Sequence, residues 1–598
     1  MAQFTQSTEQ INSLRAPSLR APSLRAPSLR APSRASEPII KLAIINFHDN
    51  SVPIPDCLIT ENLTELFGIV NIQMRDEIPI IPKIHFSFTV DRSGSMTYTC
   101  GDGKTKMEQI IHTLENMIRI FHQKTDTEIS IRVQSFDSEV NVNVNTVDNI
   151  GQKTQAELDE IIYQVRSISP GGTTDIEKAL KAANTHLDAY MKEHPETHVA
   201  HILCTDGEIT DGSADKKYLK TLVSDNYPSI FMGYGLEHDA TLLKGLASTG
   251  QHNEYRFVDN LENSGLVYGE VIHQLLYPAL EDASLLAEGC EIYNYATNTW
   301  ATKLEIGNLI SDQHKIFHIR ALVAADTQIA IYGRTIHQTR LNEDISSDIV
   351  FQTHARPVNI KTAYKCDLTN YMFRQQTQEY LFKTNALLEK QYELEHSQND
   401  RFAKYNKICY QGAAQIKKLD EELLKFKTEK ELLKKQIKDF FKTMLEYITS
   451  VNLKEDVFFK TLCDDMYIAL KSFDTQHGMM FAAARQTSQG RQQTYSSIPA
   501  EHTEVFAASQ DIFNMSPPSL KRGVAMCQPS QSTRQAVVNA DLDLDLDDDL
   551  NYTLSQKQTS AYSTVGVLKM MREVSYRAPE PATGLSIELP SDTDLPFP

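Results

Sequence analysis

The sequence predicts an α/β protein whose central part is a doubly wound, mostly parallel sheet, flanked by a β-sandwich and a helical region, with disordered tails. Three observations support this fold class. Strand-like and helix-like runs alternate over residues 83–278, as in parallel sheets covered by helices on both faces. Five strand-like runs separated by turn residues occupy most of 279–365, at 284–295, 299–304, 315–323, 329–335 and 348–353. Residues 366–490 contain few Gly or Pro and are rich in Lys, Glu, Leu and Gln, which favours helices.

The first 37 residues contain a five-residue repeat, Ser-Leu-Arg-Ala-Pro, which runs from Ser13 to Ser33. A Pro in every repeat removes a backbone donor and excludes a helix or a central strand. We therefore expect residues 1–37 to form an extended, disordered arm. We favour a low-complexity tail without a specific partner over an arm that contacts an acidic surface or is phosphorylated on Ser.

Residues 38–82 hold two further strand-like runs, 39–47 and 66–74. We expect them to pair with the strands of 279–365 in one β-sandwich, with the domain of 83–278 inserted between them. Such an insertion needs the two ends of the inserted domain to lie close together, as domain termini often do.

Within 83–278 the spacing of apolar residues distinguishes strands from helices. Residues 83–90 read as a continuous apolar strand, whereas 106–122 place apolar residues at helical spacing. The remaining runs follow in this order: strands at 128–136 and 140–147, helices at 155–165 and 175–191, a buried strand at 198–204, and strand–helix units at 229–248 and 255–276. Sheets of this kind bind ligands beyond the carboxyl ends of their strands.

Oxygen-bearing side chains follow two of these strands. An Asp-x-Ser-x-Ser loop, formed by Asp91, Ser93 and Ser95, follows the first strand, and Asp206 follows the strand at 198–204. Hard oxygen ligands of this kind suit Mg²⁺, Mn²⁺ or Ca²⁺ rather than zinc. Taken alone, the first loop also fits a Ser-rich turn in which Ser95 caps a helix.

These segments, together with 172–180, resemble the metal-ion-dependent adhesion site of the von Willebrand factor type A (VWA) family, and the resemblance covers residues 84–278. Asp91, Ser93 and Ser95 match the family's first loop, and Asp206 matches its last ligand. The family's middle ligand is a Thr, which we assign to Thr174.

Thr173 is the fallback for this middle ligand. Aligning the preceding Gly-Gly pair with the family pattern would select Thr173, but it would displace Ala179 and Leu180 by one residue.

The resemblance implies that the site recognises an Asp or Glu side chain of another protein. The ligand set agrees, because three hydroxyls and two carboxylates leave a divalent ion with positive character and an open position. Hydrolysis by a metal-activated water is the alternative, but Glu208 and Asp211 read as turn and helix-start residues rather than as a general base. We therefore expect no enzyme, with no catalytic and no organic-cofactor residues.

The β segments of 279–365 resemble those of intracellular VWA proteins from protists, fungi and plants. Some of these relatives carry a RING zinc module for ubiquitin transfer, but this chain lacks the cysteines for one. Its eight cysteines are scattered without a Cys-x-x-Cys pair, and its start lacks an apolar secretory core. We expect an intracellular, cytoplasmic protein.

The helical region spaces its apolar residues three and four apart over four to five heptads. They are Ile416, Leu419, Leu423, Phe426, Leu433, Ile437, Phe440, Met444 and Tyr447. A coiled coil that joins two chains into a homo-oligomer would use this stripe. An intramolecular helical hairpin would also use it, and we favour the hairpin because the stripe is short.

Residues 491–598 are rich in Ser, Gln, Pro and Asp, and we expect a mostly disordered acidic tail. The run from Asp541 to Leu550 alternates Asp and Leu before it ends in a cluster of Asp. We interpret it as a solvated tail, with the alternative that one of its carboxylates occupies the metal site and restrains outside partners.

Overall composition narrows the classes of partner. A net charge of −19 and a pI near 5.4 argue against a nucleic-acid binder, and no apolar run is long enough for a membrane span. His194, His198 and His201 straddle the start of a strand, and we interpret them as solvated or capping residues rather than as a metal site. His314 and His318 lack a third partner for a metal site. Two functions remain: a non-enzymatic adaptor that captures acidic motifs, and a structural assembly protein in which the metal only stabilises the fold.

Overall fold

The computed structural model describes most of the chain between residues 40 and 493 and one segment beyond it. The described ranges are 40–58, 67–75, 83–99, 104–206, 209–235, 238–250, 252–258, 264–321, 326–334, 351–354, 358–359, 365–405, 413–474, 478–493 and 562–575. The repeat arm of 1–37 and the acidic run of 541–550 lie outside the described residues.

The central sheet has six strands in the order β5-β4-β3-β6-β7-β8. Their bounds are β3 (Ile84–Asp91), β4 (Ile129–Phe136), β5 (Val140–Val147), β6 (His198–Thr205), β7 (Ser229–Tyr234) and β8 (Glu254–Val258). Only β5 runs antiparallel to its neighbour, and it forms one edge. β3 is buried along its whole length, which explains its continuous apolar sequence.

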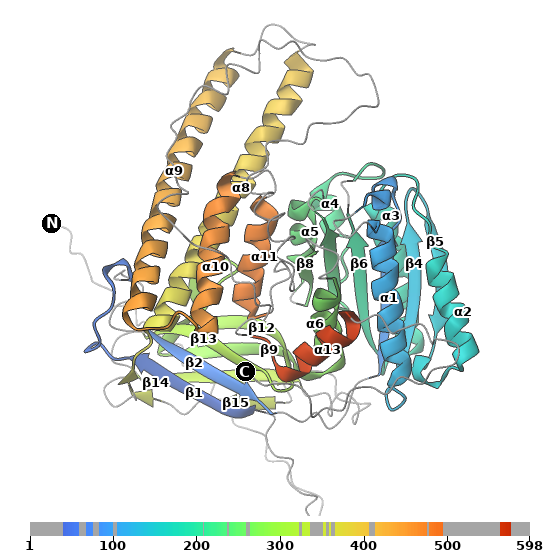
Figure 1. The fold of residues 1–598 in the computed structure, drawn as a ribbon, viewed down its shortest axis with the longest axis horizontal. Coiled ribbons are helices and arrows are strands. Elements are labelled where there is room, and N and C mark those ends of the chain that lie inside the picture. The colour runs from blue at the N-terminus through green and yellow to red at the C-terminus, as the bar shows by residue number, and fades with distance from the viewer. Residues whose placement is uncertain are drawn as a thin grey trace, which may run out of the picture. The chain divides into compact units, whose positions relative to one another are not determined.

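Helices cover both faces of this sheet (Figure 1). Residues of α1 (Lys106–Gln123), α2 (Gln155–Arg166) and α6 (Ser264–Leu276) share one apolar core with the strands. A second core contains residues of α3 (Ile176–Glu193), α4 (Lys216–Lys220) and α5 (Ala240–Ala247). The predicted class, a doubly wound and mostly parallel sheet, is confirmed.

Two antiparallel sheets form the β-sandwich. The first has the order β11 (Thr299–Ala301), β10 (Cys290–Asn294), β13 (His314–Ala321), β2 (Phe67–Met74), β1 (Ile40–His48), β17 (Lys365–Cys366), with β17 alone joining in parallel. The second has the order β12 (Lys303–Ile310), β9 (Pro278–Glu288), β14 (Asp326–Arg334), β15 (Phe351–His354), and β16 (Val358–Asn359) pairs with β14. Residues of both sheets share one core.

The connectivity places the parallel-sheet domain between two strands of this sandwich. β2 precedes the domain in sequence and pairs with β13, which follows it. One expected strand, 284–295, is in fact two: Gly289, with φ +71°, ends β9 and sends the chain into β10 of the other sheet. Gly adopts this left-handed conformation without the steric cost that a side chain brings.

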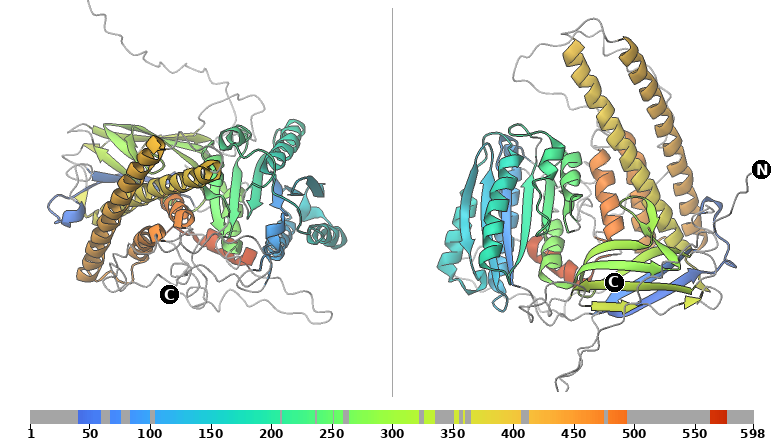
Figure 2. Two further views of the ribbon diagram at one scale, coloured as in Figure 1. Left: turned by 90° about the horizontal axis from the view of Figure 1, so that it is seen from above. Right: turned by 180° about the vertical axis from the view of Figure 1, so that it is seen from behind.

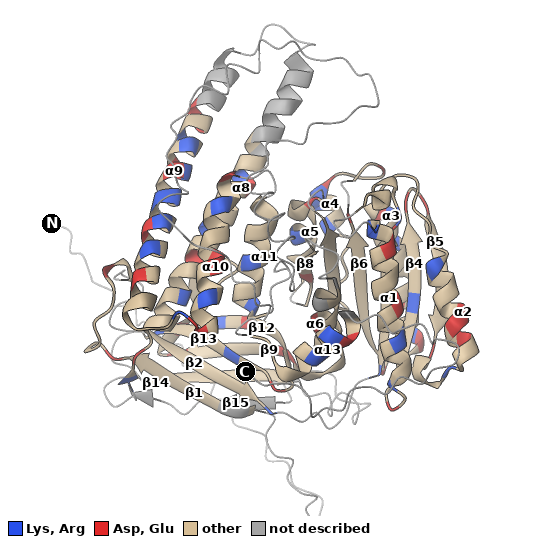
Figure 3. Cartoon of the chain, viewed as in Figure 1, with Lys and Arg blue, Asp and Glu red and all other residues tan. Residues whose placement is uncertain are grey.

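Four helices follow the sandwich: α8 (Thr369–Tyr405), α9 (Ala413–Ser450), α10 (Val457–Lys471) and α11 (Gly478–Arg491). α8 and α9 lie side by side in both views of Figure 2. The apolar stripe of α9 is buried within the chain at Leu433, Ile437, Phe440 and Met444, while Lys, Asp and Glu mark its other faces (Figure 3). The stripe thus packs within one chain, and a coiled coil between two chains stays a prediction.

The helix α11 covers β8, the edge strand of the parallel sheet opposite β5 (Figure 1). Phe481 of α11 meets Phe257 of β8 edge to face, with ring centroids 5.3 Å apart. Arg491 at the end of α11 donates to Glu254 over 2.8 Å. Covering an edge strand in this way removes a row of unpaired backbone groups from solvent.

One further helix, α13 (Val565–Ser575), lies within the stretch that the sequence predicted as a mostly disordered tail. It packs against α6 and α1, and the Asn116 amide donates to the carbonyl of Val574 over 2.8 Å. Val567, Met570, Met571 and Val574 are buried and lie three and four residues apart, a helical spacing that the sequence analysis overlooked. Among the described helices, none combines the length and the apolar character that crossing a membrane requires.

Candidate metal-binding site

Asp91 is the last residue of β3 and is fully buried. Its carboxylate accepts hydrogen bonds from the Ser93 amide at 2.8 Å and from the Thr205 hydroxyl at 2.6 Å. Burial raises the pKa of the Asp91 carboxyl to about 6, against these hydrogen bonds, which lower it. The carboxylate is therefore ionised at neutral pH and fixed in orientation.

Asp206 lies beside Asp91 because it follows β6, the parallel neighbour of β3. The Ser95 hydroxyl donates to Asp206 Oδ1 over 2.8 Å, and the hydroxyls of Ser93 and Ser95 are 3.0 Å apart. Asp91, Ser93, Ser95 and Asp206 thus form one hydrogen-bonded chain at the carboxyl ends of two adjacent strands.

Thr174 reaches this edge through its backbone. The Gly94 amide donates to the carbonyl of Gly172 over 3.1 Å, so the loop before α3 lies against the first loop. The Thr174 side chain is buried, and its hydroxyl makes no hydrogen bond with any residue that the structure describes. Thr173 is exposed, and its hydroxyl donates to Asp211 over 3.2 Å. Of the two candidates, Thr174 has the hydroxyl available for a ligand.

Gly172 permits this close approach of the two loops. Its φ is +83°, and a Cβ at this position would lie 2.8 Å from a carboxylate oxygen of Asp137. Asp137 is in turn fixed by an ion pair with Arg92, at 2.7 Å. Any side chain at residue 172 would be strained in its backbone and would displace that carboxylate.

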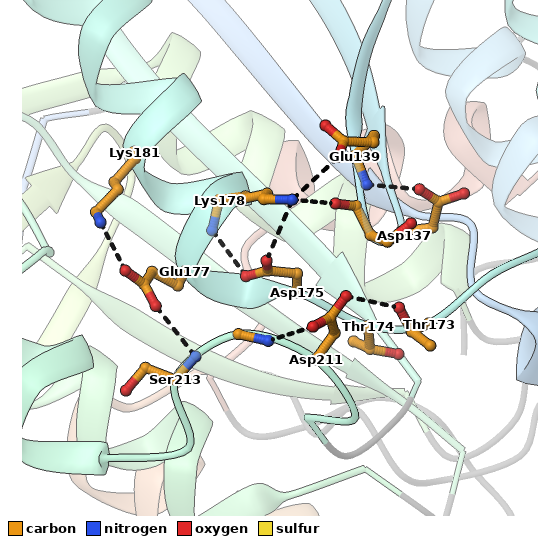
Figure 4. A network of polar contacts seen from close by, with 12 residues as sticks. Asp137, Glu139, Thr173, Thr174, Asp175, Glu177, Lys178, Lys181, Asp211 and Ser213 are labelled. Carbon is orange, nitrogen blue, oxygen red and sulfur yellow. Dashed lines mark hydrogen bonds and ion pairs between the residues drawn. The ribbon is translucent and has the colours of Figure 1, made fainter.

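The carboxylates around Thr174 are already engaged in holding the loop (Figure 4). Asp175 caps α3 by accepting from the Lys178 amide at 3.0 Å. Glu177 pairs with Lys181 at 2.6 Å and accepts from the Ser213 amide at 3.0 Å. These groups position Thr174 and leave the metal ligands to the residues predicted from the motif.

Lys106, the first residue of α1, is a member of the site that the motif does not contain. Its ammonium lies 2.7 Å from Asp206 Oδ2, and the residue is 8% exposed. The Thr105 hydroxyl caps α1 in a capping box with Glu108, which fixes where the helix begins and therefore where Lys106 stands. Asp206 is thus shared between the Ser95 hydroxyl and an internal cation.

The donor set fits a hard divalent cation. It consists of two carboxylates and three hydroxyls and contains no nitrogen or sulfur, and the Thr174 hydroxyl has no other partner among the described residues. Among the described residues, no group of three or more His, Cys, Asp or Glu side chains is placed to hold a metal ion. The hydroxyls are therefore essential to any metal site at this edge.

The histidines that the sequence analysis set aside have other partners. His201 is buried and lies 2.9 Å from the Thr89 hydroxyl, and His198 pairs with Glu281 at 3.0 Å. His318 lies 2.6 Å from the side-chain oxygen of Gln375. His201 is thus a core residue, although we expected solvated or capping histidines in its segment.

Comparisons with known proteins place this domain. The family model of the von Willebrand factor type A domain matches residues 87–269. Comparison with curated proteins gives no match.

Among solved structures, the chain is similar to a von Willebrand factor type A protein from Catenulispora acidiphila, with 11% identity, 59% of this chain and 81% of that chain covered, and a TM-score of 0.38. It is also similar to the ArnB paralog VWA2 from Sulfolobus acidocaldarius, with 15% identity, 68% and 92% covered, and a TM-score of 0.39. A third structure is proximal thread matrix protein 1 from the mussel byssus, described with a zinc-occupied MIDAS motif, with 15% identity, 32% and 45% covered, and a TM-score of 0.26. The family model thus identifies residues 87–269 of this chain as a VWA domain.

Proposed function

We propose that this chain is a non-enzymatic adaptor that captures an acidic side chain of a partner protein through a metal-ion-dependent adhesion site. VWA domains are often protein-interaction modules. The residues that would hold Mg²⁺, or Mn²⁺ or Ca²⁺ in its place, are Asp91, Ser93, Ser95, Thr174 and Asp206. The bound ion would supply a positively charged point with room for one more oxygen ligand.

The observation that carries this proposal is the meeting of Asp91, Ser93, Ser95 and Asp206 in one hydrogen-bonded chain at the end of β3 and β6. Charge supports the acidic ligand. The negative charges of the two carboxylates cancel the charge of a divalent ion. The Lys106 ammonium adds one positive charge beside Asp206. The loaded site would therefore keep a net positive charge, which attracts a carboxylate.

The rival function is structural assembly, in which the metal only stabilises the fold. Lys106 weighs against it, because its ammonium already compensates the buried Asp206 carboxylate without any metal. A fold that carries its own counter-charge has less need of an ion for stability.

Two further parts of the proposal concern chemistry and location. The Asp211 carboxylate is occupied by Thr173 and by the Gly212 amide, which supports a non-enzymatic site because it removes a nearby candidate base.

Five cysteines of the described residues are free thiols, which supports an intracellular, cytoplasmic location.

The test uses the full chain immobilised and challenged with a displayed peptide library in Mg²⁺ and again in EDTA. We expect the Mg²⁺-dependent peptides to share an Asp or Glu whose change to Asn or Gln abolishes binding. Asp91→Asn should abolish capture, whereas Asp211→Asn, on the same edge but outside the ligand set, should retain it. Near-UV circular dichroism checks that both variants remain folded.

Two results would contradict the proposal. Peptides captured equally in Mg²⁺ and EDTA would remove the metal from recognition. An Asp91→Asn variant that stays folded and captures peptides as well as the wild type would remove the site from it.

A further inference from the structure

A cavity of about 440 Å³ lies away from the metal edge, where the VWA domain, the β-sandwich and the helical region meet. β8 and α6 line it on one side, β12 and β13 on another, and α8 and the end of α11 on a third. Small-molecule sites in proteins commonly span about 300–1,000 Å³. The cavity is therefore large enough for a small ligand.

The wall of this cavity carries an excess of positive charge. Among its lining residues are four cations and two carboxylates: Lys303, Lys315, Arg374, Arg491, Glu254 and Glu305. Each carboxylate has its own cation, since Glu305 pairs with Lys303 at 2.5 Å and Glu254 with Arg491 at 2.8 Å. Lys315 and Arg374 are left without a lining carboxylate.

Lys315 is 7% exposed, and its ammonium makes no hydrogen bond or ion pair with any residue that the structure describes. Glu254 and Glu270, the carboxylates nearest to it, are held by Arg256 at 2.9 and 3.0 Å. Burial and, to a lesser extent, the neighbouring Arg491 lower the pKa of Lys315 to about 8. Burying an ammonium without a counter-ion is costly, so the site suits an anion that the described residues do not provide there.

Arg374 is 2% exposed and is a second cation that lines the cavity. Its guanidinium donates to the carbonyl of Ile316, the residue after Lys315, over 2.9 Å, and to the carbonyl of Gln489 over 3.0 Å. It also lies over the ring of Tyr562, 5.5 Å from the centroid. Among the described residues Arg374 is thus held by neutral groups, and its charge adds to the positive excess of the cavity wall.

The remaining lining suits a ligand with polar and apolar parts. The side-chain oxygen of Gln493 is buried and has no hydrogen-bond partner among the described residues. Val271, Leu275 and Ile306 supply apolar surface in the same cavity. A small molecule with an anionic group and an apolar body would satisfy both.

We propose that this cavity is a binding site for a small-molecule anion that carries a phosphate or a carboxylate, with its charged group held by Lys315. The acidic run of 541–550 is another source of carboxylates within the chain. A cavity of this volume fits a drug-sized molecule better than a ten-residue run.

The first test measures the thermal unfolding and ligand binding of the full chain with two probes, inorganic phosphate and citrate, by calorimetry. We expect at least one probe to bind the wild type and to raise its unfolding temperature. Lys315→Met should weaken that binding at least tenfold, and Lys303→Met, a lining cation already paired with Glu305, should change it by less than twofold. The probe that binds more tightly identifies the anionic group.

The unfolding temperature measured without ligand shows whether a loss of binding comes from misfolding. Lys315→Met removes an unpaired buried charge and keeps the side-chain volume, so it should raise the unfolding temperature in anion-free buffer. Binding that is equal in the wild type and in Lys315→Met would overturn the proposal, as would no binding of either probe. Binding that appears only after deletion of residues 541–549 would overturn it too, because the tail would then be the occupant.

Discussion

The metal edge, which is the candidate site of Asp91, Ser93, Ser95, Thr174 and Asp206, and the cavity lined by Lys315 carry excess charge of opposite sign. They also differ in whether the chain compensates that charge. At the metal edge the excess is negative, and the chain supplies a cation of its own, because Lys106 lies 2.7 Å from Asp206. In the cavity the excess is positive, and Lys315 has no counter-ion among the described residues. The Asp206 carboxylate is therefore compensated without a bound ion, whereas the buried Lys315 ammonium lowers the stability of the fold.

The two regions also differ in how the chain builds them. The metal edge is formed by loops between residues 91 and 206 that end adjacent strands of a single sheet. The cavity needs residues from 228 to 493, contributed by three regions of the fold. Disturbing the packing between regions should therefore affect the cavity alone.

Phe481→Ala should give the largest difference between the cavity and the metal edge. It removes the edge-to-face contact with Phe257 that holds α11 on β8, and we expect the free energy of unfolding to fall by about 3–5 kcal/mol. Phosphate or citrate binding should be lost with it, and Mn²⁺ affinity measured by titration calorimetry should stay within twofold. Leu432→Ala, at an exposed position, is the control and should cost less than about 0.5 kcal/mol. A parallel loss of Mn²⁺ binding would show that the two regions are not independent.

Lys106→Met tests the internal cation. Without metal, the Asp206 carboxylate would be buried and uncompensated, so the free energy of unfolding in urea should fall by about 3 kcal/mol. Mn²⁺ affinity should rise about tenfold, since the ion no longer competes with an ammonium, a change of about 1.4 kcal/mol. The double variant with Asp206→Asn should recover stability and lose Mn²⁺ binding. An unaltered Mn²⁺ affinity in the single variant would contradict competition.

The cavity should respond to pH through Lys315, and sulfate is the suitable probe because its own charge is constant. The pKa of Lys315 is about 8, so the ammonium loses its proton between pH 7 and 9, and sulfate affinity should fall about tenfold. The charged groups around Lys315 are Arg491, Arg256, Glu254 and Glu270. For Glu254, burial raises the pKa, but Arg256 and Arg491 hold it at about 2.

The free energy of unfolding of the ligand-free protein should rise with pH, whereas the sulfate affinity falls. Because the folded pKa of Lys315 lies below the unfolded value of about 10.5, unfolding takes up a proton between pH 8 and 10.5, and the free energy of unfolding rises with pH there. Lys315→Met is the matched control for both measurements. A variant with the same pH profile as the wild type would assign the effect to other groups.

Thr174→Val should give the smallest effect and distinguishes the two candidate threonines. The Thr174 hydroxyl has no partner among the described residues, so stability should change by less than about 0.5 kcal/mol, while Mn²⁺ affinity should fall about fivefold. Thr173→Val removes only the bond to Asp211 and should leave Mn²⁺ affinity unchanged. The reverse result would transfer the middle ligand to Thr173.

Local patterns were enough to predict the parallel-sheet domain. Its strands and helices carry distinct apolar periods, and the structure places them in the expected order, with β5 as the antiparallel edge. The motif also predicted Asp91, Ser93, Ser95 and Asp206 at one edge, because the carboxyl ends of neighbouring parallel strands meet there. Their binding of a metal stays a prediction.

Features that depend on distant contacts escaped the sequence analysis. Lys106 reads as an ordinary first residue of a helix, and only the packing of α1 brings it to Asp206. Lys315 lies in a strand whose periodicity gives no sign that β13 lines a cavity. The turn at Gly289 was missed because both strands around it are apolar.

The hydrogen bond from Asn116 to Val574 joins positions 458 residues apart. During synthesis, α6 leaves the ribosome about 300 residues before α13 is complete, an interval of roughly 15–60 s at ~5–20 residues per second. Val267, Val271 and Ile272 share their core with Met570 and Val574 of α13. The nascent VWA domain therefore lacks the helix that packs on α6 and α1 throughout that interval.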